Sequence, residues 1–280
     1  MNSAQWLPIA PVKAQGKIEG SIVLYEGPSM LTGDPIVVII TGLKAGSKNS
    51  KTGDLPQVWI IRQDLDPYQA QQTGLDVAVC GSCVLRPVNS DRRKKLGIDR
   101  ACYVDTVKSV GSIFKAYTRD RYNTIADLED PADLVDMIGD RRVRLGAYGD
   151  PMAWPLTTAD LHDGCDGIAI LEFLKLAGFP ITTGYSHQWK RIHDRKLADR
   201  WARIVMASCD TRSDHDMAID RGFTPAMLDT GDRPSGSVLC PAQSTNGRVS
   251  CATCTDGTGS ALCSGGGSRS VLFEVHGTRT

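Results

Sequence analysis

The fold is decided by Val143-Arg-Leu-Gly-Ala-Tyr-Gly-Asp150, an apolar run that ends in the polar pair Gly-Asp. Such a run predicts a buried strand, and residues 168–177 have helical periodicity with Gly178 as a stop. The run Ile181-Thr-Thr-Gly-Tyr-Ser-His187 then predicts the next strand. Strands that alternate with helices indicate right-handed strand–helix–strand units and a mainly parallel sheet.

The same alternation extends on both sides of this stretch. Further strands are expected at 21–25, 36–41, 58–62, 76–80, 203–210, 223–228, 237–240 and 271–276, and helices at 67–74, 108–117, 126–138, 197–201 and 214–221. We therefore predict an α/β fold: a partial or complete parallel α/β barrel, similar in outline to a TIM barrel. The expected parts are a β-rich N-terminal extension (1–75), the barrel-like core (76–239) and a Cys-rich metal-binding segment with a closing strand (240–280).

Composition excludes some classes of protein. The chain has 280 residues, with 32 basic and 32 acidic side chains, so its total charge favours no particular partner. It contains no apolar run of about 18 residues, and its first residues lack a secretory pattern, so we expect no membrane association and a cytoplasmic location. Basic runs at 91–95 and 140–144 predict a solvated face or a nucleic-acid contact.

Seven of the nine cysteines form two groups with the spacing of metal ligands. The first cysteine set is Cys80, Cys83 and Cys102, and the second cysteine set is Cys240, Cys251, Cys254 and Cys263, with His276 downstream as a further candidate ligand. In a reducing compartment, paired thiols at this spacing favour zinc or an iron–sulfur cluster over disulfides. The first set leaves one coordination position open, whereas the second is complete. Thiolates alone do not discriminate between zinc and iron.

Polar side chains follow several of the expected strands. Asp150, His187 and Asp210 each stand where a strand ends, and parallel strands bring their carboxyl ends to one edge. We therefore predict that these three residues meet in one catalytic site. Alternatively, Asp150 and Asp210 cap the segments that follow them. Trp154 and Trp189 are candidates for stacking on a base or for the core.

The ordered motifs resemble a group of phage and plasmid proteins, and they are similar to the gene 88 protein family of mycobacteriophages. The resemblance runs from about residue 30 to the end of the chain. It implies an origin in a phage or mobile element, and thus the cytoplasm of a host cell. It rests on Cys80-Gly-Ser-Cys83, Cys102-Tyr103-Val104, Arg144-Leu-Gly-Ala-Tyr-Gly-Asp150-Pro151, Gly184-Tyr-Ser-His-Gln-Trp189, Met206-Ala-Ser-Cys-Asp210, Cys240-Pro-Ala, the pair Cys251 and Cys254, and His276-Gly277.

A more distant resemblance concerns mechanism. A Cys-Tyr dipeptide that closes an N-terminal cysteine set, followed by strands ending in Gly-Asp and by aromatic–polar motifs, resembles radical-SAM-like barrel proteins. The resemblance implies that the first cysteine set holds a [4Fe–4S] cluster whose open iron binds S-adenosylmethionine, with Tyr103, Gly149 and Gln188 as cofactor contacts. The second set would hold an auxiliary cluster. In place of the compact CxxxCxxC loop, this chain has a CxxC pair and a third cysteine after 18 residues.

Two other interpretations remain open. The outline is also similar to zinc-containing base-exchanging transglycosylases that modify phage DNA, in which Asp150 and Asp210 would be acid and nucleophile. A third interpretation is a non-catalytic, zinc-stabilised nucleic-acid-binding protein with Arg92, Arg93, Arg141, Arg142 and Arg144 on phosphates. The leading prediction is an iron–sulfur metalloenzyme that acts on a nucleic acid or nucleotide.

Overall fold

The computed structural model describes residues 16–44, 49–95, 102, 104–178 and 182–274. The strands are β1 (Ser21–Pro28), β2 (Pro35–Thr41), β3 (Gln57–Arg62), β4 (Asn123–Thr124), β5 (Val143–Tyr148), β6 (Asp166–Gly167), β7 (Thr182–Thr183), β8 (Tyr185–Ser186), β9 (Met206–Cys209), β10 (Pro225–Leu228), β11 (Val238–Leu239) and β12 (Val271–Phe273). The helices are α1 (Pro67–Thr73), α2 (Val77–Cys80), α3 (Ser90–Lys95), α4 (Gly111–Tyr117), α5 (Ala132–Ile138), α6 (Ile170–Leu176), α7 (Arg195–Ala202), α8 (Arg212–Asp220) and α9 (Pro241–Ser244).

The first sheet is mixed and has the order β4-β1-β2-β3-β5-β7, with β6 paired to the outside of β1. Its N-terminal part is an antiparallel meander of β1, β2 and β3, whose apolar runs are buried. From β3 onward the direction is constant, because β3, β5 and β7 are parallel. The N-terminal extension predicted from the sequence is therefore continuous with the sheet of the core.

The second sheet is entirely parallel, with the order β11-β12-β10-β9-β8. Only Gly184 separates β7 of the first sheet from β8 of the second, so one extended segment passes between the two sheets. A Cβ on Gly184 would lie 3.0 Å from Cβ of Leu145, which explains why a residue without a side chain occurs where these strands come close.

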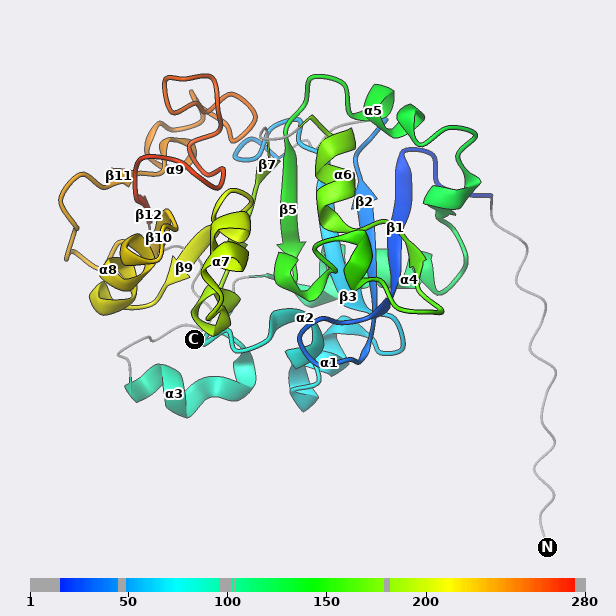
Figure 1. Cartoon of the computed structure of the whole chain (residues 1–280), viewed down its shortest axis with the longest axis horizontal. Helices are drawn as coiled ribbons and strands as arrows, with labels where there is room; N and C mark the ends of the chain where they lie inside the picture. Colours follow the sequence, from blue (N-terminus) through cyan, green and yellow to red (C-terminus); the bar gives the residue numbers. More distant parts are fainter. Residues whose placement is uncertain (1–15, 45–48, 96–101, 103, 179–181, 275–280) are drawn as a thin grey trace, which may run out of the picture.

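These sheets confirm the α/β class and the parallel core. The strands of the described ranges form two open sheets and no closed barrel, so barrel closure stays a prediction. The strands expected at 143–150, 181–187 and 203–210 occur at the predicted places but are shorter. In Figure 1 helix α6 lies across the front of the first sheet near β5, and helices α7 and α8 lie by the second sheet.

One element was predicted wrongly. Residues 76–80 were expected to form a strand, but residues 77–80 are the short helix α2. The apolar run Val-Ala-Val is explained by burial of Ala78 and Val79 against the core and not by strand pairing. Cys80 therefore stands at the end of a helix. It still reaches the end of β5, because the backbone N–H of Asp150 donates to the carbonyl of Val79 at 2.6 Å.

The core includes both tryptophans that were candidates for base stacking. Trp154 and Trp189 are fully buried. The indole of Trp154 donates to the carbonyl of Ile168, and that of Trp189 to the carbonyl of Ser208 at 2.9 Å. Their role is therefore packing, with each polar edge satisfied by the backbone. Among the described residues, no helix combines the length and the apolar character that a membrane crossing needs.

Candidate functional site

A cavity of about 880 Å³ opens along the carboxyl ends of the parallel strands and extends under the Cys-rich segment. Its wall includes Gly149 and Asp150 after β5, His187 after β8 and Asp210 after β9. Both cysteine sets also line it: Cys80, Cys83, Cys102, Cys240, Cys251, Cys254 and Cys263. The three residues expected to meet at one sheet edge are thus brought to one cavity, together with both cysteine sets and Cys209.

Asp150 is held by backbone groups on both sides of the cavity edge. One carboxylate oxygen accepts from the backbone N–H of Met152 at 3.0 Å, which caps the turn that follows β5. The other oxygen accepts from the backbone N–H of His187 at 2.9 Å. Burial raises the pKa of Asp150, and hydrogen bonds from Ser186, Met152 and His187 oppose the rise. This carboxylate therefore fixes the turn that carries His187, in line with the capping alternative.

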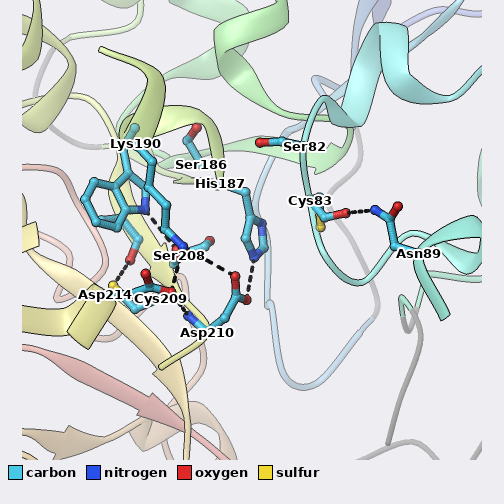
Figure 2. Close-up of polar contacts among 12 residues, drawn as sticks. Ser82, Cys83, Asn89, Ser186, His187, Lys190, Ser208, Cys209, Asp210 and Asp214 are labelled. Atoms are coloured by element: carbon cyan, nitrogen blue, oxygen red, sulfur yellow. Dashed lines mark hydrogen bonds and ion pairs between the residues drawn. The ribbon is translucent and has the colours of Figure 1, made fainter. Parts of the chain in front are cut away.

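The imidazole of His187 lies between a thiol and a carboxylate (Figure 2). Its Nε2 is 3.3 Å from Oδ1 of Asp210, and Cys83 lies on the other side of the ring. Burial alone would lower the pKa of His187, but the charge and hydrogen bonding of Cys83 and Asp210 outweigh it, so the pKa lies well above its ordinary value. This arrangement favours a protonated imidazole at the cavity wall.

Asp210 is in turn positioned by a lysine. The ammonium of Lys190 lies 3.7 Å from Asp210 and 2.6 Å from Asp214. Burial would raise the pKa of Asp210, but the hydrogen bond and charge of His187 and the charge of Lys190 lower it overall. The helix after β9 is capped by Thr211, so Asp210 is not the cap that the alternative interpretation expected. Its carboxylate instead contacts the imidazole of His187 and the ammonium of Lys190.

The turn Cys80-Gly-Ser-Cys83 is held against the same strand end by Gln188. The Gln188 amide donates to the carbonyl of Cys80 at 3.0 Å and accepts from the backbone N–H of Ser82 at 3.1 Å. Gly81 has φ of +52°, and a Cβ there would lie 2.4 Å from Oε1 of Gln188. Gln188 is buried and is absent from the cavity wall, so its contacts are structural.

A buried ion pair closes the other side of this turn. The guanidinium of Arg86 donates to Asp76 at 2.6 Å and 3.0 Å, and to the carbonyl of Gly81 at 3.1 Å. Both charged groups are almost fully excluded from solvent. The backbone between Cys80 and Cys83 is therefore held in place on both sides, while the thiol side chains keep their rotational freedom.

The thiols of the first set are close enough to influence one another. Burial raises the pKa of Cys80 well above its usual range, and the neighbouring charges of Asp76, Cys83 and Cys102 add to the rise. Burial also raises the pKa of Cys102 to about 11. In the described part of the chain, no three His, Cys, Asp or Glu side chains are already drawn into ligand geometry. Metal binding would therefore require these thiols to lose protons and move together.

Tyr148 adds a polar group that the sequence patterns did not reveal. It is buried on the cavity wall, and burial together with the charges of Cys80, Asp76 and Cys102 raises the pKa of its hydroxyl. Among the described residues, the hydroxyl oxygen makes no regular hydrogen bond, although it lies close enough to the thiol of Cys80 to interact with it. A buried hydroxyl normally has one, so this group fits a ligand in the cavity.

The remaining predicted site residues have different outcomes. Tyr103 and His276 lie outside the described residues. Gly149 lines the cavity with φ of +83°, and a Cβ there would meet the carbonyl oxygen of Ile60 at 2.5 Å. No sequence pattern singled out Lys190. Tyr148 and Tyr185, which line the cavity, stood within predicted strands but without a predicted role.

The arginines of the basic runs are engaged largely with backbone carbonyls. Arg141 donates to the carbonyls of Gly42 and Leu43, and Arg142 donates to those of Cys254 and Gly259. Arg93 donates to the carbonyl of Arg86. These contacts favour a structural role over the phosphate contacts of the nucleic-acid-binding interpretation.

Comparison with known proteins adds no family: the chain matches no protein-family model, no curated protein and no solved structure. The class of the protein therefore rests on its α/β fold and on the chemistry of the cavity.

Proposed function

We propose that this chain is a metalloenzyme whose reaction centre is held by the first cysteine set at the mouth of the cavity. The observation that carries the proposal is the convergence of both cysteine sets, Asp150, His187 and Asp210 on one cavity. Ligands of open parallel sheets bind at the carboxyl ends of strands, where this cavity opens. A volume of about 880 Å³ lies in the range of small-molecule sites.

The donor set fits a thiophilic metal centre. Three thiols on one wall and the unpartnered hydroxyl of Tyr148 beside them support a bound group at this point. The leading form is an iron–sulfur cluster, because three thiolates leave one metal position for a second ligand such as S-adenosylmethionine. Such a centre would supply one-electron chemistry. Zinc at the same thiols is the alternative metal.

The residues of the chain would manage protons around this centre. His187 would hold or release a proton at the cavity wall, and Asp210 would orient its ring and stabilise the protonated form. Lys190 and Asp214 keep Asp210 in place. Asp150 fixes the backbone of His187. Because Asp150 is occupied by backbone N–H groups, the transglycosylase interpretation, which needs it as acid or nucleophile, has less support.

The proposed substrate is a nucleotide or a base within a nucleic acid. Tyr185 and Phe273 both line the cavity and meet edge to face with ring centroids 5.5 Å apart. An aromatic pair that lines the same cavity as His187, Asp210 and Arg212 suits a flat ring with polar edges.

The test is anaerobic purification, followed by iron, sulfide and zinc analysis and an absorption spectrum. We expect a brown protein absorbing near about 400 nm and, once a one-electron reductant is added, reductive cleavage of added S-adenosylmethionine. Replacing Cys80, Cys83 and Cys102 together by Ser should abolish the cleavage and remove the iron, whereas Cys165→Ser should change neither. A colourless protein with zinc at the first cysteine set would refute the iron–sulfur form. Metal content unaffected by the triple replacement would refute the proposal itself.

A further inference from the structure

The second cysteine set lies in a segment that packs onto the loop before β3. The backbone N–H of Cys251 donates to the carbonyl of Lys51 at 2.9 Å, and that of Ala252 to the carbonyl of Thr52 at 3.1 Å. The four thiols of this set line the cavity from this side. In Figure 1 the segment, drawn in orange to red, stands apart from the helices that cover the sheets.

An arginine from outside the segment forms hydrogen bonds with the turn between Cys251 and Cys254. Arg142, just before β5, donates to the carbonyls of both cysteines and to that of Gly259 at 3.2 Å. These hydrogen bonds join the Cys-rich segment to the amino end of β5. The segment itself is rich in Gly, Ser and Thr and has few apolar side chains to bury, so it needs another source of order.

Cations and hydrogen-bond donors surround the four thiols. Burial raises the pKa of Cys251, and the charges of Arg144, Lys51 and Arg142 oppose the rise. Burial also raises the pKa of Cys263, to about 12, and the hydrogen bond with the Tyr185 hydroxyl opposes this rise. At Cys240 and Cys254, hydrogen bonds from backbone N–H groups oppose the rise in pKa that burial causes. Burial outweighs these groups at all four thiols, so what they contribute is their position: Lys51, Arg142 and Arg144 lie close enough to the thiols to offset negative charge gathered there.

We infer that Cys240, Cys251, Cys254 and Cys263 bind one zinc ion as a tetrathiolate site, which fixes the Cys-rich segment as a wall of the cavity. Four thiols each release a proton to solvent, and four thiolates with one Zn²⁺ leave a charge of −2. The positive charges of Lys51, Arg142 and Arg144 offset this negative charge. Four ligands complete the tetrahedral coordination of zinc, so this site would be structural and closed.

This inference is independent of the reaction proposed at the first cysteine set. Without zinc, the wall depends on four thiols, of which only Cys240 and Cys254 are fully buried, and on a segment poor in apolar side chains. We therefore expect zinc removal to loosen residues 240–270 and the loop at 49–53 together, because their backbones are hydrogen-bonded, while β1 and β2 stay protected. The cavity would then open on this side.

The test uses the full chain and zinc alone as the probe. Competition with a chromophoric chelator gives stoichiometry and affinity, and hydrogen exchange with and without chelator shows which segments loosen. We expect one zinc that persists when the first cysteine set is replaced by Ser and is lost in Cys251→Ser/Cys254→Ser. Lys51→Met and Arg144→Met should each weaken zinc binding by about 10- to 100-fold, and Cys165→Ser should have no effect.

Three results would overturn the inference. The first is zinc binding that survives Cys251→Ser/Cys254→Ser in a chain whose first cysteine set is also replaced by Ser. The second is iron with inorganic sulfide at these four cysteines, since a cluster is not a single-ion site. The third is unchanged exchange of residues 240–270 on zinc removal. None of these results bears on the first cysteine set, whose failure would show instead as metal content unaffected by its triple replacement.

Discussion

The buried pair of Arg86 and Asp76 gives the sharpest test of how the first cysteine turn is built. Arg86→Met keeps the aliphatic bulk but leaves the Asp76 carboxylate, which is 1% exposed, without its cation. It also removes the donor to the carbonyl of Gly81. Leaving one charge of a buried pair uncompensated costs about 3–5 kcal/mol, so we expect a loss of that size in the free energy of unfolding.

The assay is urea unfolding, with the midpoint and slope compared between variants. Arg233→Met is the matched control, because Arg233 pairs with Asp229 at the surface and should matter far less. The double variant Arg86→Met/Asp76→Asn removes the stranded charge, so it should be more stable than Arg86→Met alone. The reasoning is refuted if Arg86→Met costs no more than the control, or if the double variant is less stable than the single one.

Three further variants test the neighbourhood of the cavity. Gly149→Ala should destabilise the protein by about 1–3 kcal/mol more than Gly33→Ala, because both have φ of +83° but only the first Cβ meets a backbone oxygen; equal shifts in thermal midpoint would contradict this. Gln188→Leu should lower metal content at the first cysteine set and spare the second, as metal analysis would show; unchanged content would mean that the amide does not hold the turn. The pKa of Asp210 is lowered in the folded chain, so its stabilisation is present above its ordinary pKa and is lost as the pH falls through the folded value. Asp210→Asn should therefore flatten the acid side of the stability curve, followed by urea midpoints below about pH 5; a curve of unchanged slope would count against the contact with His187.

The parallel core was predictable because its signals are local. The strand at 143–148 is an apolar run bounded by turn residues, and Gly178 follows the helix at 170–176. These patterns depend only on residues near in sequence. The strand expected at 76–80 was wrong because a short apolar run suits a buried helix as well as a buried strand. Its form was decided by packing of Ala78 and Val79 against the core.

The candidate site was predictable in part. The rule that parallel strands end at one edge of a sheet correctly predicted that Asp150, His187 and Asp210 share one cavity. It did not predict that their roles differ. Asp150 proved to be tied to backbone N–H groups, whereas Asp210 faces His187. That difference depends on which groups approach each carboxylate from other strands, and the spacing of residues in the sequence does not predict it.

The contributions of Tyr148 and Lys190 depend on tertiary contacts that have no pattern in the sequence. Tyr148 lies in a strand whose alternation says only that its side chain points to one face of the sheet. Its unpartnered hydroxyl becomes evident only when the cavity is built. Lys190 reaches Asp210 and Asp214 from the turn after His187, and a single lysine in a loop carries no signal by itself.

The central claim is that both cysteine sets hold metal on one cavity. The most direct measurement is anomalous X-ray scattering at the iron and zinc edges, from crystals of the anaerobically purified chain. We expect one anomalous peak among Cys80, Cys83 and Cys102 near His187, and a second among Cys240, Cys251, Cys254 and Cys263. If either cysteine set lacks anomalous density, or if the density lies only elsewhere, this expectation is contradicted.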